Sequence, residues 1–457
     1  MEVIHIYHTN DLHSHFEHWP RMQQFLEKRR KWHQDAGEEF LLFDIGDHAD
    51  RSHPLTEATK GKANIELLNK AGFHAITIGN NEGITFPYDD LDYLYENRQF
   101  DVLLANLVYK DGHRPQWLKD HTIYETKKGV KLGVTGLTAN YTYLYDLLGW
   151  QTHDPFDSLK QQINLLKGKT DIMILLSHLG IHDDERIGQE FPDIDVVIGG
   201  HTHHILHEGK MEGNTLLTCA GKYGMYIGHI QLTVDTAAGR IIEKKAWLYD
   251  TNDLPPVENE EEQVNQLYKR GKDILSSAVV ASDCNDISKE DLAVMLCQAI
   301  QDWCHADCAF MNEGIILEGL ASGKVTRYDL LKLCPHPINP AVVELSGSEL
   351  KEVLAQTMDE KWKDLQIFGL GFRGKMMGKM VYSGIDVKKE KDYYRFSIHG
   401  QFIESDRTYK LAIPDMFTFG RFFPSIFRAK NKQYYLPEFL RHLLEWRIGE
   451  IEKQSVN

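Results

Sequence analysis

The sequence predicts an α/β domain followed by a second, smaller α+β domain. From Met1 to about Asp250, short apolar strands alternate with helical segments, a pattern typical of a central sheet covered by helices. Beyond about residue 278, helical and strand-like segments mix without that alternation. The 457 residues are enough for two or three domains, each with a full hydrophobic core.

The strands and helices of the first domain are predicted from apolar runs and their boundaries. The predicted strands are residues 3–7, 40–45, 75–78, 102–105, 172–176 and 196–198. The predicted helices are residues 22–32, 62–71 and 155–166. The last helix has the clearest start, because Asp154 can cap its N-terminus and Pro155 suits the first helical position.

A domain boundary is predicted where the strand–helix alternation stops. Residues 251–263, TNDLPPVENEEEQ, contain prolines, are strongly acidic and have few apolar side chains. The helical pattern over residues 258–276 suits a helix that joins two domains. We therefore expect a first domain, a linker helix with a hinge, and a second domain at residues 1–254, 255–277 and 278–457.

Two motifs of the second domain have structural explanations. Ser346 and Glu349 match a capping box that opens a helix running to about Met358. Residues 369–374, GLGFRG, fit the pattern G-x-G-x-x-G, but no predicted strand precedes them and no helix follows. We expect a flexible substrate or interdomain loop there, and no dinucleotide fold.

Composition narrows the classes of partner and the compartment. The formal net charge of −16 argues against binding a nucleic-acid polymer, and no apolar run reaches the length of a membrane span. The N-terminal residues MEVIHIYHTNDLHSH lack the basic and apolar regions of a secretory leader. The six cysteines have no disulfide-framework spacing, so we expect a cytoplasmic protein with reduced thiols. Cys297, Cys304 and Cys308 share one helix face, and buried free thiols are favoured over a soft-metal site.

Polar side chains of metal-ligand type follow several predicted strands directly. Because the carboxyl ends of strands in an open α/β sheet form its binding edge, these side chains should gather in one place. A buried cluster of this kind is too costly unless cations neutralise it. The segment TIGNNEG, residues 77–83, contributes amides and a carboxylate, and the other strand ends contribute Asp11, His13, Asp44, Asp47, His48, His178, His201, His203 and His204.

The ligand types predict a pair of transition-metal ions. Oxygen and nitrogen donors without thiolates suit two ions of Mn²⁺, Zn²⁺, Fe or Co, and leave the metal's identity open. One carboxylate must bridge the ions, and Asp47 lies between the two groups of ligands in chain order. Such a centre activates a bridging water and holds a phosphoryl group for in-line attack.

The series Asp11-x-His13, Gly46-Asp47, Gly79-Asn80, His178 and Gly200-His201-Thr202-His203 resembles the calcineurin-like metallophosphoesterases. The opening HTNDLHSHF resembles their 5′-nucleotidase branch, which includes the UDP-sugar hydrolases, and the resemblance covers nearly the whole chain. It implies a four-layer αββα sandwich, a connecting helix and a C-terminal substrate-binding domain that rotates to carry substrate to the metals. It also implies one metal held by Asp11, His13, Asp47 and His203, and a second held by Asp47, Asn80, His178 and His201.

Asn81 departs from the family pattern at a catalytic position. The family has histidine there, which stabilises the transition state or protonates the leaving oxygen, and often an aspartate at the position of Ile84. An amide donates a hydrogen bond but cannot transfer a proton. Three explanations are compatible with activity: replacement by His48 or His53, a substrate with a good leaving group, or slow hydrolysis by the metals alone.

The second domain also departs from the family pattern. The expected Asn-Gly-Gly-Gly-Ile-Arg stretch reads NEGII at residues 312–316, without the arginine. Arg373 and Arg421 are candidate replacements. Phe417 and Phe419 could hold a nucleotide base between them, although hinge packing explains these rings equally well.

Three functions are therefore open. The leading hypothesis is a di-metal phosphohydrolase that removes phosphate from a nucleotide or related phosphorylated metabolite by metal-activated hydroxide attack. The alternatives are a phosphodiesterase or nucleotide pyrophosphohydrolase, whose better leaving group tolerates Asn81, and a catalytically weak nucleotide-binding sensor. The sequence leaves the substrate, metal and oligomeric state open.

Overall fold

The computed structural model describes residues 1–391, 393–420 and 422–456. Its chain forms two compact units, Met1–Gly271 and Lys272–Asn457. Helix α9 (Glu260–Ser277) crosses from one unit to the other, where the linker helix is predicted. The finer division into two domains and a separate hinge stays a prediction.

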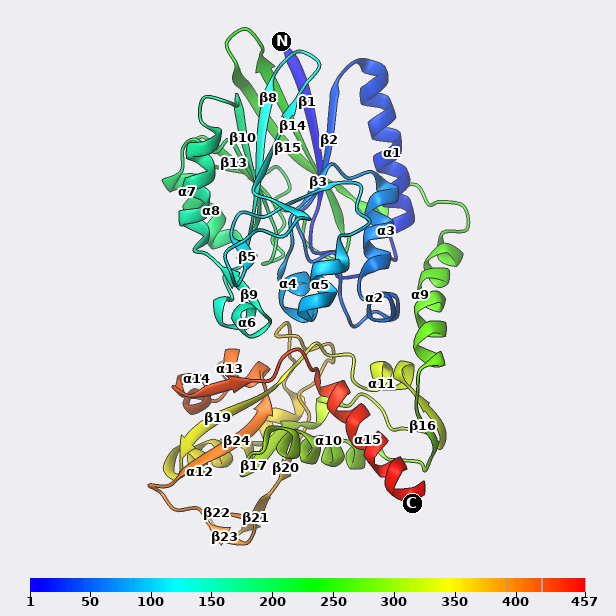
Figure 1. Ribbon diagram of the computed structural model, residues 1–457, viewed down its shortest axis with the longest axis vertical. Helices are drawn as coiled ribbons and strands as arrows, with labels where there is room; N and C mark the ends of the chain where they lie inside the picture. The colour runs from blue at the N-terminus through cyan, green and yellow to red at the C-terminus, as the bar shows by residue number, and fades with distance from the viewer. Residues whose placement is uncertain (392, 421, 457) are drawn as a thin grey trace. The chain divides into compact units, whose positions relative to one another are not determined.

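The first unit contains a seven-stranded sheet formed largely by the N-terminal half of the unit (Figure 1). β1, β2, β3, β4 and β6 run parallel, and β14 and β15 add antiparallel strands at the β1 edge. In spatial order the strands are β15 (Arg240–Asp250), β14 (Tyr226–Asp235), β1 (Glu2–Thr9), β2 (Glu39–Asp44), β3 (Ala75–Ile76), β4 (Asp101–Leu103) and β6 (Leu118–Lys119).

A six-stranded sheet is stacked against the first. Its strands β8, β10, β11 and β13 are parallel, and the two edge strands are antiparallel to their neighbours. In spatial order they are β12 (Lys210–Glu212), β13 (Thr215–Thr218), β11 (Val196–Gly199), β10 (Ile172–His178), β8 (Lys131–Thr138) and β7 (His121–Glu125). A small two-stranded sheet joins β5 (Leu107–Tyr109) and β9 (Trp150–Thr152).

Helices cover the outer faces of both sheets, so the first unit has four layers (Figure 1). Ile6 and Phe43 of the first sheet pack with Ile174 and Ile198 of the second in a hydrophobic core between the sheets. The outer face of the six-stranded sheet packs on two helices through a second core. The αββα sandwich is therefore confirmed. Its helices are α1 (Trp19–Ala36), α2 (Pro54–Thr59), α3 (Lys62–Ala71), α4 (Asn80–Thr85), α5 (Tyr88–Leu94), α6 (Thr142–Leu147), α7 (Pro155–Leu166) and α8 (Ile181–Glu190).

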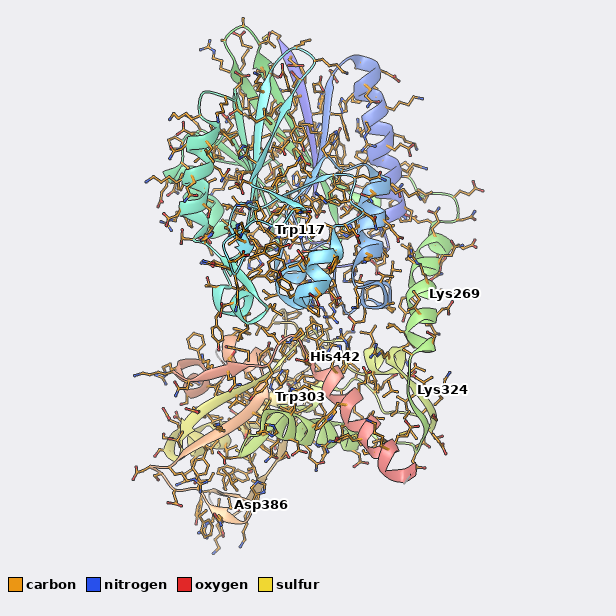
Figure 2. The ribbon with its side chains drawn as sticks, viewed as in Figure 1. Trp117, Lys269, Trp303, Lys324, Asp386 and His442 are labelled. Atoms are coloured by element: carbon orange, nitrogen blue, oxygen red, sulfur yellow. The ribbon has the colours of Figure 1, made fainter. Side chains whose placement is uncertain are left out.

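The second unit is α+β, as predicted, with its own hydrophobic core. Its strands, sheet by sheet, are β16 (Val279–Cys284) and β18 (Gly323–Thr326); β20 (Met380–Ser383), β17 (Cys308–Asn312), β24 (Thr408–Pro414), β19 (Pro340–Ser346) and β25 (Lys432–Tyr434); and β21 (Ile385–Lys389), β22 (Tyr394–Ile398) and β23 (Gln401–Phe402). Its helices are α10 (Lys289–Cys304), α11 (Arg327–Leu333), α12 (Gly347–Thr357), α13 (Met416–Phe419), α14 (Pro424–Arg428) and α15 (Leu440–Val456). Side chains fill the interior of each unit (Figure 2).

Several local predictions hold because short-range contacts decide them. The Asp154 side chain accepts hydrogen bonds from the backbone N–H groups of Phe156 and Asp157, as expected of a helix cap. The capping box of Ser346 and Glu349 is also present. Residues 369–374 lie in turns outside any helix or strand, in agreement with the loop predicted there. The β14–β15 hairpin, strand β8 of the six-stranded sheet and helix α8, however, are among the elements missing from the prediction.

All six cysteines are free thiols. Cys297, Cys304 and Cys308 are buried in the core of the second unit, in agreement with the predicted buried thiols. The predicted common helix face is wrong, because α10 ends at Cys304 and Cys308 is the first residue of β17. Burial raises the pKa of the Cys304 and Cys308 thiols to about 12, so both are protonated at neutral pH. Among the helices described, none combines the length and apolar character that a membrane crossing requires.

Candidate metal centre

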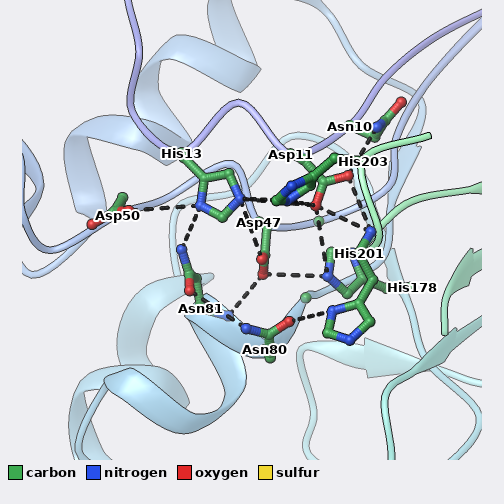
Figure 3. Close-up of polar contacts among 12 residues, drawn as sticks. Asn10, Asp11, His13, Asp47, Asp50, Asn80, Asn81, His178, His201 and His203 are labelled. Carbon is green, nitrogen blue, oxygen red and sulfur yellow. Dashed lines mark hydrogen bonds and ion pairs between the residues drawn. The ribbon is translucent and has the colours of Figure 1, made fainter. Parts of the chain in front are cut away.

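The predicted metal ligands meet at the carboxyl ends of strands from both sheets (Figure 3). Since neighbouring parallel strands end at the same edge of their sheet, loops far apart in the sequence converge there. The seven residues are Asp11 and His13 after β1, Asp47 after β2, Asn80 after β3, His178 at the end of β10, and His201 and His203 after β11.

Asp11, His13 and His203 form one side of the cluster. The Nε2 atoms of the two imidazoles are 3.3 Å apart. Asp11 Oδ1 lies 3.9 Å from His13 Nε2 and 3.5 Å from His203 Nε2. The Asp11 carboxylate is held from behind, because it accepts hydrogen bonds from Asn10 Nδ2 at 2.8 Å and from the backbone N–H of His201 at 3.1 Å.

Asp47 lies between the two sides of the cluster. Its Oδ2 is 3.6 Å from His13 Nε2, and its Oδ1 is 3.4 Å from His178 Nε2. His178 Nδ1 donates a hydrogen bond to the carbonyl oxygen of Ile45 at 2.6 Å. That bond leaves Nε2 facing the Asp11 and Asp47 carboxylates, and this buried nitrogen has no partner within hydrogen-bond distance.

Asn80 and His201 form the other side. Asn80 Oδ1 lies 2.7 Å from His201 Nδ1, so the amide oxygen and the imidazole face each other (Figure 3). The Tyr141 hydroxyl is 3.3 Å from the other ring nitrogen, Nε2, and orients the imidazole from the side away from Asn80. Sequence patterns did not indicate Tyr141, because it lies on a loop without a ligand motif.

The loops that carry the ligands adopt unusual backbone conformations. Five predicted ligands have positive φ angles, at Asp11 (51°), His13 (49°), Asp47 (51°), His201 (70°) and His203 (58°). Left-handed conformations are uncommon for residues other than glycine, and they concentrate at functional sites. The five left-handed conformations therefore support a functional role for these loops.

Gly79 allows the loop after β3 to approach Asp47 closely. A Cβ atom on Gly79 would lie 2.0 Å from Asp47 Oδ1 and 2.6 Å from His178 Cε1. Any larger residue would therefore collide with two ligands. Glycine is therefore required before Asn80 by the closeness of the ligands.

Glu82 fixes two of the ligand loops. Its Oε2 accepts hydrogen bonds from the backbone N–H groups of Asp47 and Gly79, both at 2.9 Å. Its Oε1 accepts one from the N–H of Ala49 at 2.8 Å. One buried carboxylate therefore ties the loop after β2 to the start of α4.

The charges within the cluster are strongly coupled. Burial raises the pKa of Asp11, although His178 opposes the rise. Burial also disfavours the ionised form of Asp47, but His178 and His13 hold the pKa of Asp47 well below its usual range. Conversely, although burial lowers the pKa of His178, Asp47 raises it to about 10. Without another cation, the cluster takes up a proton on His178 to balance its carboxylates.

His201 and His203 are ready to act as ligands. Burial lowers the pKa of His201 to about 4 and that of His203 to about 3. Both imidazoles are therefore neutral at pH 7, and a neutral imidazole carries the lone pair that binds a metal.

This arrangement of donor atoms fits divalent cations. Ligands at about 2.1 Å from one cation are separated from each other by roughly 3.0–3.4 Å, close to many of the distances here. One ligand atom from each of Asp11, His13 and His203 lies within 4.8 Å of the others, and so does one from each of Asp11, Asp47 and His178. The unpartnered Nε2 of His178 and the mixed carboxylate–imidazole set are the chemistry that such an ion would complete.

Asn81 lies within the cluster, where it contacts the proposed ligands Asp47 and His13. Its backbone N–H donates to Asp47 Oδ1 at 2.7 Å, and its side-chain Nδ2 is 2.7 Å from His13 Nδ1. Asp50, which sequence reasoning missed, places Oδ2 at 3.6 Å from the same nitrogen. The Asn81 amide is at hydrogen-bond distance and donates to His13 Nδ1, whereas the Asp50 carboxylate contacts that nitrogen electrostatically from farther away.

The structure brings neither His48 nor His53 into the cluster. The His48 ring packs edge-on against Trp19 with centroids 5.2 Å apart, and its Nδ1 is 3.2 Å from Asn64 Nδ2. His53 caps α2 by accepting a hydrogen bond from the N–H of Leu55. A catalytic role for His48 stays a prediction, and its surroundings favour packing, since burial lowers its pKa to about 3.

The substrate-binding candidates of the second unit differ in exposure. Phe417 is fully buried among Phe310, Phe422 and Phe423, so its ring has no open face for a base. Phe419 is 40% exposed and stacks on Tyr434 with centroids 5.5 Å apart.

The two arginine candidates can be placed only in part. The backbone N–H of Arg373 donates to His336 Nδ1 at 2.8 Å, and the Arg373 guanidinium donates to the carbonyl oxygen of Phe372. Arg421 lies outside the described residues. Substrate contacts by either arginine stay predictions.

Comparison with known proteins places both units in described families. Residues 4–204 match the calcineurin-like phosphoesterases, and residues 271–421 match the 5′-nucleotidase C-terminal domain. The chain is 42% identical over 462 residues to the uncharacterized metallophosphoesterase YunD of Bacillus subtilis, an alignment that covers 98% of this chain and 100% of that protein. It is 24% identical to a 5′-nucleotidase of Diplobatis ommata, over 76% of this chain and 69% of that protein.

The fold also has relatives among solved structures. The NAD nucleotidase NadN of Haemophilus influenzae superposes with a TM-score of 0.66 at 16% identity, covering 100% of this chain and 97% of that one. At this identity the likeness shows a shared two-domain fold.

Proposed function

Because the chain belongs to the calcineurin-like phosphoesterases that carry a 5′-nucleotidase C-terminal domain, and is thus a metal-dependent phosphoester hydrolase, we propose that it hydrolyses a nucleotide or a related phosphorylated metabolite at a two-metal centre. The convergence of seven carboxylate, amide and imidazole ligands from both sheets is the observation that carries this proposal. The free thiols suit a reducing compartment, and we propose a cytoplasmic location.

Two cations at these ligands would supply Lewis-acid charge that polarises a phosphoryl oxygen and lowers the pKa of a nearby water. Asp11, His13, Asp47 and His203 would hold one cation, and Asp47, Asn80, His178 and His201 the other. The two Asp47 oxygens, which face different imidazoles, support a bridging role for this carboxylate.

The surrounding residues would hold the ligands in place. Glu82 fixes the backbone of Asp47 and Gly79, and Ile45 sets the tautomer of His178 through its carbonyl oxygen. Asp50 and Tyr141 would orient the rings of His13 and His201. Such outer hydrogen bonds typically change metal affinity or activity by about 10–100-fold.

A hydrolase acting on phosphoanhydrides or diesters is a second candidate, favoured by Asn81. Its side chain faces His13 and cannot transfer a proton to a leaving oxygen. The leaving group of a phosphoanhydride or an activated diester departs without such a proton. A nucleotide-binding sensor with weak turnover is the third.

A substrate panel tests these candidates. The purified chain would be assayed with Mn²⁺, Zn²⁺, Fe²⁺ or Co²⁺ against nucleotide monoesters, diesters and anhydrides. Monoester turnover at rates comparable to those for anhydrides supports the leading proposal. Turnover restricted to anhydrides or diesters supports the second candidate, and nucleotide binding without turnover supports the sensor.

Asn81→His tests whether the missing proton donor limits the rate. We expect a rise of about 10-fold on monoesters and little change on anhydrides. This is below the full 10²–10⁴-fold of general acid catalysis, because Ile84 cannot orient the new imidazole. An unchanged monoester rate would mean that another group already supplies the proton. Asn81→Gln, which keeps the amide, is the matched control.

We also propose that Phe419 contributes a stacking face for a base. Phe419→Ala should raise KM for a nucleotide while leaving the rate on a small aryl phosphate unchanged. Phe417→Leu is the control for packing alone, since Phe417 is fully buried. Equal KM values for wild type and Phe419→Ala would exclude stacking by this ring.

A further inference from the structure

A second group of histidines lies in the first unit on the face of the seven-stranded sheet that α1 covers. His5 is on β1, His229 is on β14 and His33 is on α1. Tyr7 lies directly opposite His229 in the β1–β14 pairing, so His5 is on the same face, two residues along the strand. His5 is four residues from the end of β1, roughly 13 Å from the strand end that leads to the candidate metal centre.

The four polar groups of this cluster are close together. His5 Nδ1 is 2.9 Å from His229 Nε2. Glu38 Oε2 is 2.9 Å from His33 Nδ1 and 3.2 Å from His5 Nε2. One ligand atom from each of the three histidines lies within 4.8 Å of the other two. All three histidines are buried, whereas the Glu38 side chain is 33% exposed.

The end of α1 brings Glu38 to this cluster. Gly37, with φ of 74°, takes the left-handed conformation that ends the helix, and the backbone N–H of Glu38 donates to the carbonyl oxygen of His33. The chain reversal therefore sets the carboxylate beside the last histidine of the helix. His33 and Glu38 form a compact pair of donors that faces the sheet.

Two tyrosine hydroxyls orient the imidazoles. The Tyr7 hydroxyl is 3.0 Å from His33 Nε2, and the Tyr249 hydroxyl is 3.3 Å from His229 Nδ1. Metal-binding histidines usually have such a partner on the ring nitrogen that does not bind the metal. Trp247 Nε1 in turn donates to the Tyr249 oxygen at 2.9 Å.

Burial disfavours the protonated form of the imidazoles in this cluster. Burial lowers the pKa of His5 to about 4 and that of His229 to about 2, and the neighbouring Arg29 lowers both further. Both rings are therefore neutral at pH 7 and can bind a cation without first losing a proton. Three imidazoles with one carboxylate suit Zn²⁺, Co²⁺, Ni²⁺ or Cu²⁺, and suit Mg²⁺ or Ca²⁺ poorly.

We propose that His5, His33, His229 and Glu38 form a second, structural transition-metal site that ties α1 to the sheet. The site is separate from the phosphoesterase centre and does not depend on the proposed function. The other explanation of the cluster is a hydrogen-bonded network of neutral imidazoles that binds no metal, and the two differ in metal content.

Zinc stoichiometry distinguishes the two explanations. The full-length protein would be stripped with a chelator, reloaded with Zn²⁺, desalted and analysed for zinc per chain. We expect His33→Gln and His229→Gln each to bind one zinc fewer than the wild type while keeping wild-type phosphoesterase activity. His121→Gln, a histidine bonded to Gln162 in the same unit, is the matched control and should keep the full zinc content.

Two further measurements keep the proposal testable if a core variant fails to fold. Glu38→Gln changes only the partly exposed ligand, and should weaken zinc binding at this site by at least about 10-fold. With Co²⁺, the wild type should show an additional visible absorption band that is absent in this variant. Identical zinc content and Co²⁺ spectra in the wild type and Glu38→Gln would overturn the proposal.

Discussion

The two histidine-rich regions of the first unit are built in different ways. In the candidate metal centre, five of the seven proposed ligands lie on loops after strands and have left-handed backbone conformations. In the cluster of His5, His33 and His229, the histidines lie within regular strands and a helix. The centre contains two buried aspartates, whereas the second cluster has one partly exposed glutamate.

The two regions differ in how much backbone strain is needed to place their side chains. Strands and helices place side chains by their own repeat and need no strain, so the second cluster can form as a by-product of packing α1 on the sheet. The centre requires strained loops, close glycine contacts and a buried glutamate clamp. Costs of this kind persist where a reactive geometry must be held.

The strongest test of the comparison removes a ligand from the centre. Asp47→Asn should lower activity with any divalent metal by more than about 100-fold, because groups that only hydrogen-bond to ligands already cost about 10–100-fold. Zinc analysis should show that the centre loses metal while the second cluster keeps its own. Loss of zinc from both regions would mean that they are coupled. Asp111→Asn, which changes an exposed loop aspartate, serves as the control.

A smaller effect is expected from Glu82→Gln, which alters the clamp and leaves every ligand in place. The new amide can accept fewer hydrogen bonds from the three N–H groups that Glu82 now satisfies, and one buried donor left unpaired costs about 1–3 kcal/mol. We expect metal affinity at the centre to fall by about 10–100-fold in calorimetric titration.

The matched control for the clamp is Glu349→Gln, an exposed capping-box glutamate in the second unit. It should change stability by less than about 1 kcal/mol and leave metal affinity unchanged. If Glu82→Gln behaves like this control, the centre does not depend on its loop clamp.

The smallest expected effect is on the pH dependence of folding stability, through His74, a histidine outside both regions. Burial lowers the pKa of His74 to about 4, and its Nδ1 accepts a hydrogen bond from the N–H of Leu42. Because the unfolded state binds the proton more readily, His74 stabilises the fold fully above about pH 6.5, and this contribution is lost as the pH falls towards 4.

His74→Gln should therefore reduce the acid-side slope of unfolding free energy by at most about 1.4 kcal/mol per pH unit. Urea unfolding of the metal-free protein at several pH values measures that slope. His113→Gln changes an exposed histidine and is the control. An equal slope in His74→Gln and wild type would show that burial of a lone histidine contributes nothing to acid sensitivity here.

Local sequence patterns predicted part of the first unit and supplied the candidate ligands. Residues 62–71 and 155–166 form helices with the predicted bounds, because their apolar spacing and caps are short-range features. The ligands could be proposed because a polar residue directly after a parallel strand must lie at the sheet's carboxyl edge, whatever the rest of the fold does.

Tertiary structure decided which other residues join the sites. Asp50 and Tyr141 lie beside ligands from loops distant in the sequence, and no local pattern marks them. Glu82 lies in the segment TIGNNEG that the sequence marked, but its hydrogen bonds to the loop of Asp47 and Ala49 depend on the fold. Phe417 and Phe419 are two residues apart, yet one is fully buried and the other is 40% exposed. Side-chain exposure and cross-chain hydrogen bonds depend on which surfaces pack together.

The histidine cluster under α1 shows the same division. The sequence predicts a strand at His5, but its predicted helix over residues 22–32 stops one residue before His33, which the structure includes in α1. Only the pairing of β1 with β14 and the docking of α1 bring both within reach of His229. Strand pairing and helix docking depend on contacts between distant parts of the chain. The sequence alone therefore shows which side chains could bind a metal, and the fold decides which of them lie close together.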